Sequence, residues 1–262
     1  MKKILFAVLL TCLAVSGIAQ TLQETFNRAL APCQYYDAER AEASQKLPAG
    51  VQFDTETVRK YLKLFRNVHP TKEQFSCVAY YTSLHNEDAR KVLGYLVQIG
   101  KINADTRDAL GRTPFEVLLK NTKHYSANLH WTLETAWYLY DLGSRDVNAT
   151  DRFGNTVLHL TVNSTPEQWL TQLARWVEIG VKDVPNKYDD TALNLVEQRI
   201  TNIDEDIRLD EGISKRKLRS EYKKARKVLK NTPAEKQRQE EERKAARALF
   251  LQTLQNVAQT DK

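Results

Sequence analysis

One short sequence motif, which we call the repeated phrase, occurs three times in the middle of the chain, at residues 108–118 (DALGRTPFEVL), 151–160 (DRFGNTVLHL) and 186–195 (NKYDDTALNL). Its threonines, Thr113, Thr156 and Thr191, are 43 and 35 residues apart. A phrase that recurs at a spacing in the thirties is typical of stacked helical repeats, in which each repeat packs on its neighbours. The stretch therefore predicts an all-α binding scaffold rather than an enzyme.

Each repeat is expected to consist of a helix, a turn, a second helix and an extended segment. The threonine opens the first helix, because its hydroxyl can accept a hydrogen bond from a free backbone N–H. Glycines at 100, 143 and 180 follow apolar segments and are placed where a left-handed C-cap ends a second helix. Because Gly100 has no complete phrase before it, we expect an earlier, degenerate repeat that begins near Thr71.

These residues resemble the ankyrin repeat family. The sequences at 113–118 (TPFEVL) and 156–161 (TVLHLT) match part of its Thr-Pro-Leu-His-x-Ala phrase. The resemblance implies an all-α ankyrin-repeat solenoid of about three to four repeats over residues 71–203, flanked by N-terminal and C-terminal capping helices. The chain departs from the pattern at 121–130, an insertion that lengthens either the helix-helix turn or the first helix, and at Asp189, which replaces a glycine.

Ankyrin arrays bind proteins through extended segments and first helices, so the resemblance also implies where a partner would bind. We expect the tips of the extended segments to carry the contact, and exposed aromatic and cationic side chains are enriched at interface hot spots. The alternative is that Phe153 and Tyr188 pack on neighbouring segments. The predicted partner-binding residues are Leu110, Arg152, Phe153, Lys187 and Tyr188.

The chain start predicts export. Two lysines precede an apolar run at residues 4–15, and small residues at 16–19 place a signal-peptide cleavage site before Gln20. The run is too short to span a bilayer comfortably. We therefore expect residues 1–19 to be a signal peptide and the mature protein to be periplasmic or secreted. Residues 20–70 are expected to form a helical cap that packs on the first repeat.

The cysteine content fits an oxidising compartment. Cys12 lies within the predicted signal peptide, which leaves Cys33 and Cys77 in the mature chain. We expect one disulfide between them that ties the N-terminal segment to the first repeat. The alternative is two buried free thiols.

The C-terminal region, residues 204–262, is predicted to be helical and basic. Residues 205–262 hold 16 Lys and Arg against 10 Asp and Glu, which equals the +6 net charge of the whole chain. A helix capped by Ser214 carries a narrow apolar stripe at 218, 222, 225 and 229, and a second helix from 234 carries one at 246, 250, 254 and 257. The plain interpretation is a helical hairpin that covers the last repeat. The alternative is a weak contact with an anionic surface or an acidic partner.

The sequence contains no Gly-rich phosphate loop, no His-Glu-x-x-His motif and no Cys-x-x-Cys pair. We therefore expect no enzyme activity, no cofactor, no metal site and no nucleic-acid partner. His124 and His130 lie within the insertion without an obvious third ligand. The first hypothesis is regulation or neutralisation of a partner protein, as by an immunity protein against a delivered toxin. The alternative is an envelope-associated protein that supports an oxidative-stress enzyme or is anchored through its basic C-terminal helix.

Overall fold

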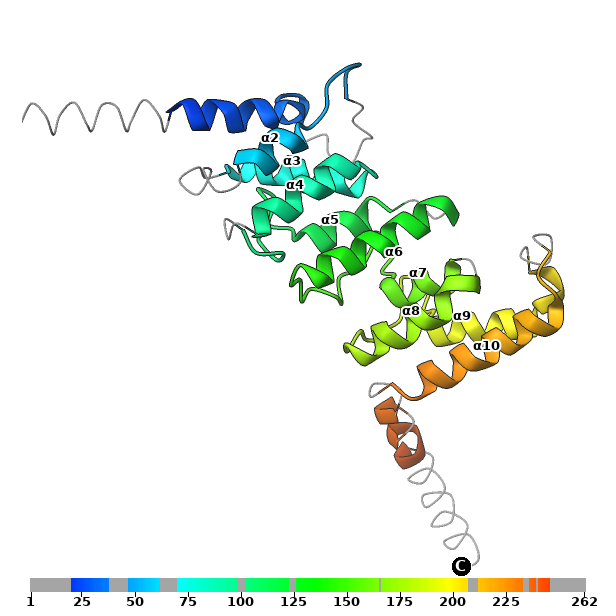
Figure 1. Cartoon of the computed structure of the whole chain (residues 1–262). Helices are drawn as coiled ribbons and strands as arrows, with labels where there is room; N and C mark the ends of the chain where they lie inside the picture. Colours follow the sequence, from blue (N-terminus) through cyan, green and yellow to red (C-terminus); the bar gives the residue numbers. More distant parts are fainter. Residues whose placement is uncertain are drawn as a thin grey trace, which may run out of the picture. The chain divides into compact units, whose positions relative to one another are not determined.

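The computed structural model describes residues 20–37, 47–61, 70–98, 102–122, 126–164, 166–206, 212–232, 236–238 and 240–245. These residues are helical or irregular, with no strand among them, so the predicted all-α class is confirmed (Figure 1). The chain divides into two compact units, residues 1–151 and 152–262, which are described separately. The predicted signal peptide and the stripe at 246–257 lie outside the described residues.

The first unit is built around two helix pairs. α3 (Lys72–Ser83) packs on α4 (Glu87–Gln98), and α5 (Pro114–Lys120) packs on α6 (Ser126–Asp141). Thr71 and Thr113 cap α3 and α5, each accepting from the backbone N–H three residues on. The side chains of Gln74 and Glu116 accept in return from the threonine N–H groups, which completes two capping boxes.

The N-terminal region packs on the first of these pairs. Residues 20–29 are helical, a 3₁₀ turn η1 spans Ala31–Tyr35, and α2 spans Thr55–Tyr61. A disulfide joins Cys33 to the buried Cys77 of α3, with a Cα–Cα distance of 5.5 Å. Gln74 also donates to Asn27 over 2.9 Å, so the helix at 20–29 is held to the start of α3.

The insertion lengthens the helix-helix connection, one of the two expected elements, and the second helix as well: five residues separate α5 from α6, against three between α3 and α4. α5 has seven residues, as does α7 in the second unit, so the first helix keeps its length. Residues 126–130 instead form the start of α6, which has 16 residues against 12 in α4. Leu129 and Leu133 are both buried, and their burial favours helix at this end. The added residues therefore extend both the connection and the second helix.

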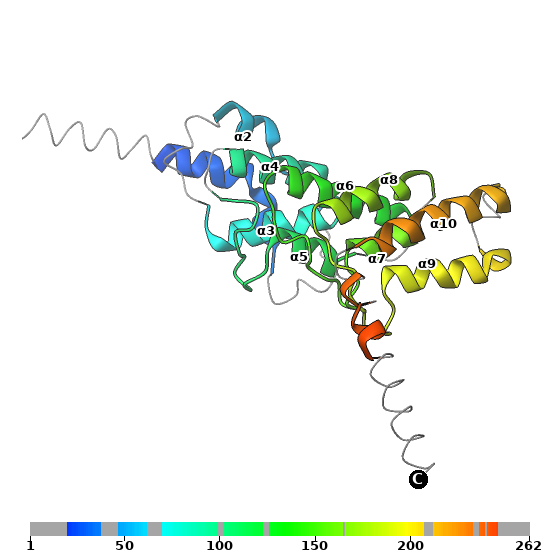
Figure 2. The same ribbon diagram turned by 90° about the horizontal axis from the view of Figure 1, so that it is seen from below.

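The second unit contains a helix pair followed by a longer C-terminal packing layer. α7 (Val157–Asn163) packs on α8 (Pro166–Glu178), and α9 (Ala192–Thr201) leads through η4 (Ile203–Glu205) to α10 (Lys215–Lys230). Figures 1 and 2 show α10 running beside α8 and α9. Ser214 caps α10 as predicted, and the predicted stripe is fully buried, at Leu218, Tyr222, Ala225 and Leu229.

Candidate functional site

Irregular segments connect the second helix of one pair to the first helix of the next, and we call them fingers. The third finger, residues 179–190, ends in a tight turn that is stabilised by hydrogen bonds to Asn186. Its Oδ1 accepts from the N–H groups of Tyr188 and Asp190 over 2.8 and 3.1 Å, and its N–H donates to the Asp190 carbonyl over 2.9 Å. Asp189 stands where the other two copies of the phrase have glycine. It adopts φ 60°, the left-handed conformation that glycine favours and that Asp tolerates. The turn therefore survives the loss of the glycine.

One backbone hydrogen bond and one side-chain hydrogen bond join the tip of this finger to the tip of the preceding finger. The Lys187 N–H donates to the Phe153 carbonyl over 2.9 Å, and Asn186 Nδ2 donates to Asn155 Oδ1 over 2.8 Å. Gly154 allows the approach, because a Cβ there would lie 3.2 Å from the Lys187 nitrogen and its φ is 82°. The two tips are consequently held in one register.

A buried histidine connects these tips to α7. His159 is fully buried, its Nδ1 accepts from the Thr156 N–H over 3.2 Å, and its Nε2 lies 2.9 Å from the Asp190 carbonyl oxygen. Because Nδ1 accepts, the hydrogen-bond network assigns the proton to Nε2, which donates to Asp190. Asp190 also accepts from Gln198 of α9 over 2.8 Å, so α7, α9 and the tip are linked.

Four of the five predicted binding residues meet on this frame, and we call them the finger-tip surface: Arg152, Phe153, Lys187 and Tyr188. The Arg152 guanidinium lies 4.8 Å from the centre of the Phe153 ring, which stacks on Tyr188 with a centroid distance of 6.3 Å. Phe153 is half-buried, whereas Arg152 and Lys187 are exposed and Tyr188 is 68 % exposed. The two aromatic rings thus pack on one another and still present a face to solvent.

Leu110, the fifth predicted residue, lies on the first finger in the first unit. Its side chain is 52 % exposed, and its N–H donates to Asp108 Oδ1 over 2.9 Å. Asp108 also binds the N–H and the guanidinium of Arg112, with side-chain distances of 2.9 and 3.0 Å. The structure brings four of the predicted residues together and does not place Leu110 with them.

The residues that shape the tips, Asp108 and Asn186, were not predicted from the sequence. Asp108 and Asn186 each accept two backbone N–H groups, from the residues two and four positions later. Asp and Asn favour such turns because a short side-chain acceptor replaces a backbone one. The signal was present, since Asp108, Asp151 and Asn186 begin the three copies of the repeated phrase.

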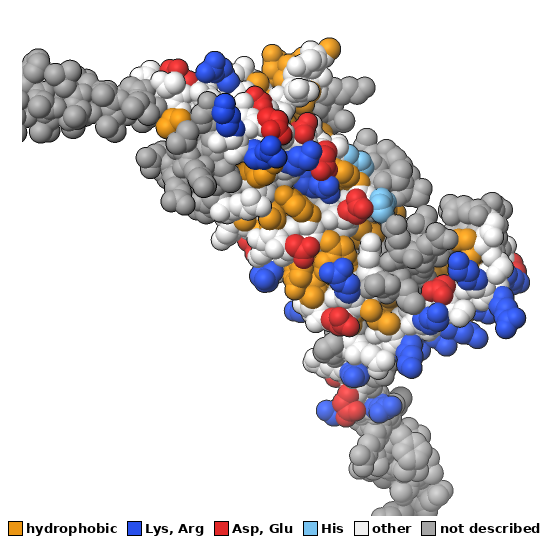
Figure 3. Space-filling view, in the orientation of Figure 1, with side chains coloured by type: hydrophobic (Ala, Val, Ile, Leu, Met, Phe, Trp, Pro, Cys, Tyr) orange, Lys and Arg blue, Asp and Glu red, His pale blue; other side chains and the backbone are white. Residues whose placement is uncertain are grey.

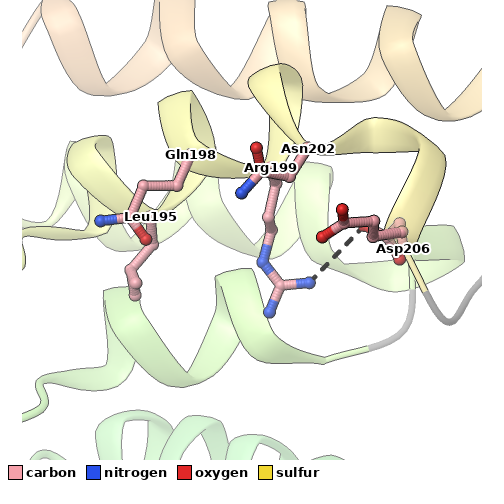
Figure 4. Close-up of a pocket in the computed structure, with 6 residues that line it drawn as sticks. Leu195, Gln198, Arg199, Asn202 and Asp206 are labelled. Atoms are coloured by element: carbon pink, nitrogen blue, oxygen red, sulfur yellow. Dashed lines mark ion pairs between the residues drawn. The ribbon is translucent and has the colours of Figure 1, made fainter.

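A pocket beside α9 is a further candidate site in this unit (Figure 4). It is lined by Leu195, Gln198, Arg199, Asn202, Glu205 and Asp206. Figure 4 shows the Arg199 and Asp206 side chains joined as an ion pair, at 3.8 Å. Arg199 also donates to Asn163 over 2.6 Å, and Tyr222 donates to Asp206. Arg199 and Asp206 thus already bind one another and residues of α7 and α10, which is the arrangement of a structural link between α7, α9 and α10.

Aromatic side chains in the first unit also pack rather than form an open platform. Arg90 of α4 lies 4.5 Å from the Trp131 ring centre and 5.4 Å from that of Tyr138, both on α6. Burial raises the pKa of Tyr138 above its usual value, against the smaller opposing effect of Arg90. Trp137 and Trp176 are buried, whereas the Trp169 side chain lies outside the described part of the chain. The aromatic residues of α4 and α6 thus hold neighbouring helices together.

The described residues contain neither a candidate metal site nor a candidate membrane-spanning helix. No group of three or more His, Cys, Asp or Glu side chains among them is placed to hold a metal ion, and His130 pairs with Glu134 at 3.2 Å. No helix within the same residues has the length and apolar character needed to cross a membrane. No known family model matches the chain, and a comparison with curated proteins finds no match.

Proposed function

We propose that the chain is an exported ankyrin-repeat protein that binds and regulates another protein through the finger-tip surface. Three features support the ankyrin assignment: threonine-capped first helices, fingers between the helix pairs, and the histidine of the repeated phrase bonded to the next finger. The proposal assigns the chain no reaction and no cofactor. The predicted signal peptide places the mature chain, beginning at Gln20, in the periplasm or outside the cell.

The observation that carries the binding role is the exposed stack of Arg152, Phe153 and Tyr188. A Tyr that is 68 % exposed while stacked on a second ring is held in place before binding. Such an anchor loses little conformational entropy when a partner covers it, and Tyr and Arg are frequent hot-spot residues. Lys187 beside it favours a partner surface with acidic groups.

We propose neutralisation of a toxin delivered to the periplasm as the role of this contact. The second candidate role is support of an oxidative-stress enzyme in the same compartment. A strain that lacks the protein distinguishes them. Sensitivity to a toxin-delivering neighbour supports the first role, and sensitivity to peroxide alone supports the second.

The binding site is tested in cells that export the protein with a photo-crosslinking amino acid at position 185, an exposed position on the third finger that the variants below leave unchanged. We expect one cross-linked partner, and loss of its capture by the variant Arg152→Ala/Phe153→Ala/Lys187→Ala/Tyr188→Ala. Tyr35→Ala is the matched control, because Tyr35 is another exposed tyrosine, at 51 %, and lies on η1. Equal capture by wild type and the quadruple variant, both folded by circular dichroism, would refute the finger-tip site.

A further inference from the structure

α10 carries a row of five basic side chains that have no acidic partner in the described part of the chain. Among the described residues, no carboxylate pairs with any of the five, whereas three other cations of the helix, Lys215, Lys224 and Lys230, pair with Asp204, Glu221 and Glu197. We call these five residues the basic stripe: Arg216, Arg219, Lys223, Arg226 and Lys227.

The spacing of the stripe puts its members on one side of the helix. They follow one another at intervals of three, four, three and one residues, which at 3.6 residues per turn confines them to an arc of about 100°. From Arg216 to Lys227 the row is about 16 Å long at 1.5 Å per residue. Figure 3 shows Lys and Arg side chains gathered over α10.

The apolar residues of α10, centred roughly 120° around the helix from the stripe, are not available to a partner. Leu218, Tyr222, Ala225 and Leu229 are all fully buried within the second unit, so the helix cannot insert an apolar edge into a partner. A specific protein interface normally has an apolar or aromatic centre, which the stripe lacks. A contact made by this face is therefore electrostatic, and its affinity depends on the charge density of the opposing surface.

The stripe also contains a surface depression of suitable chemistry for phosphate. It is lined by Lys215, Arg216, Arg219, Ser220 and Lys223, that is, by four cations and one hydroxyl. We propose that the basic stripe docks the protein on a bilayer that contains anionic phospholipid, with headgroup phosphates on this depression and no insertion of the helix. This contact uses none of the residues of the finger-tip surface, so either proposal can be refuted without affecting the other.

The test is co-sedimentation of the full chain with vesicles of phosphatidylcholine, with and without phosphatidylglycerol. We expect stronger binding to the anionic vesicles than to the neutral ones, with the difference falling steeply as salt is raised. Each basic residue near an anionic surface strengthens binding about fivefold. Arg219→Gln/Lys223→Gln is therefore expected to weaken binding about 25-fold.

The matched control is Lys217→Gln/Lys224→Gln. It removes the same charge from the same helix, at positions roughly 110° to 130° around the helix from the centre of the stripe. We expect it to retain most of the binding. Both variants share residues 1–19 with wild type, so any contribution of the apolar run cancels.

Four outcomes would overturn the proposal. Equal loss in the two variants would mean that net charge alone matters, and equal binding to neutral vesicles would mean that the stripe is not used. Displacement by inorganic phosphate beyond that by chloride at equal ionic strength would indicate a soluble phosphate site. Retention on immobilised polyglutamate but not on anionic vesicles would assign the stripe to an acidic protein.

Discussion

The hydroxyl of Tyr138 on α6 occupies the space directly over Gly94 on α4. A Cβ built on Gly94 would come within 1.9 Å of that oxygen, which itself donates to the Arg90 carbonyl over 3.3 Å. The two residues lie on consecutive helix pairs of the first unit, so the close packing of α4 on α6 depends on the missing side chain.

Gly94→Ala is expected to destabilise the protein by about 1–3 kcal/mol, as overpacking of a close contact does. An exposed glycine in the middle of a helix would respond in the opposite way, because Ala favours helix by about 1 kcal/mol. Urea unfolding measures the effect. Gly94→Ala/Tyr138→Phe should recover part of the loss, and a single variant as stable as wild type would contradict the contact.

Removal of the disulfide by Cys33→Ala/Cys77→Ala is expected to lower the free energy of unfolding by about 4 kcal/mol. The bond closes a loop with a sequence separation of 44 residues, and cross-linking a loop of that length restricts the unfolded chain. Reduction of wild type with dithiothreitol should give a similar loss and leave the variant unchanged. Two alkylatable thiols in unreduced protein from the periplasm would disprove the bond in the native protein.

Asp146→Asn is expected to change how stability depends on pH. Burial raises the pKa of Asp146 above 3.8, outweighing the hydrogen bond that it accepts from Thr113 over 2.6 Å. The folded protein thus binds this proton more tightly than the unfolded chain, and the contribution of Asp146 to stability falls as pH rises from about 3.8 through the raised pKa.

Asparagine keeps an acceptor for Thr113 and carries no charge. The urea midpoint of wild type relative to Asp146→Asn should therefore fall as the pH rises above 3.8, and level off once the pH exceeds the raised pKa. Asp141→Asn, at an exposed position at the end of α6, controls for loss of a surface carboxylate. A relative midpoint that rises with pH would have the wrong sign for a raised pKa.

Tyr222→Phe is expected to cost about 2 kcal/mol, because it removes a hydrogen bond to the carboxylate of Asp206. The Asp206 side chain is 3 % exposed, so water replaces the lost donor poorly. Tyr188→Phe is the matched control, since Tyr188 is exposed at the finger tip. Equal stability of the two variants, measured by thermal unfolding, would show that the Tyr222 hydroxyl is not needed.

Local chemistry was predictable from the sequence, and contacts between distant segments were not. The caps at Thr113 and Ser214 and the buried stripe of α10 depend on residues within one or two helical turns, where side-chain type and spacing decide the outcome. The pairing of Gly94 with Tyr138 crosses 44 positions and has no periodic signal. The link from Arg199 to Asn163 and Asp206 is likewise set by how α7, α9 and α10 meet.

The insertion shows why a length change is hard to assign from sequence. Residues 121–130 were expected to extend the helix-helix turn or the first helix, and the second helix is lengthened too, because the burial of Leu129 on α6 is a property of the packed unit. The tips of the fingers show the opposite case. The positions of Arg152 and Tyr188 next to the repeated glycine or its substitute were enough to place them at the tips, whereas their stacking through Phe153 required the structure.

The bond from Lys187 to Phe153 is made by backbone atoms, and Asn155, Asn186 and His159 supply the side-chain bonds of the frame. The shape of the two tips is therefore encoded at positions other than those of the finger-tip surface. Side chains at 152, 153, 187 and 188 can diversify while the backbone beneath them keeps its geometry. A library randomised at these four positions would therefore present new surfaces on an unchanged scaffold.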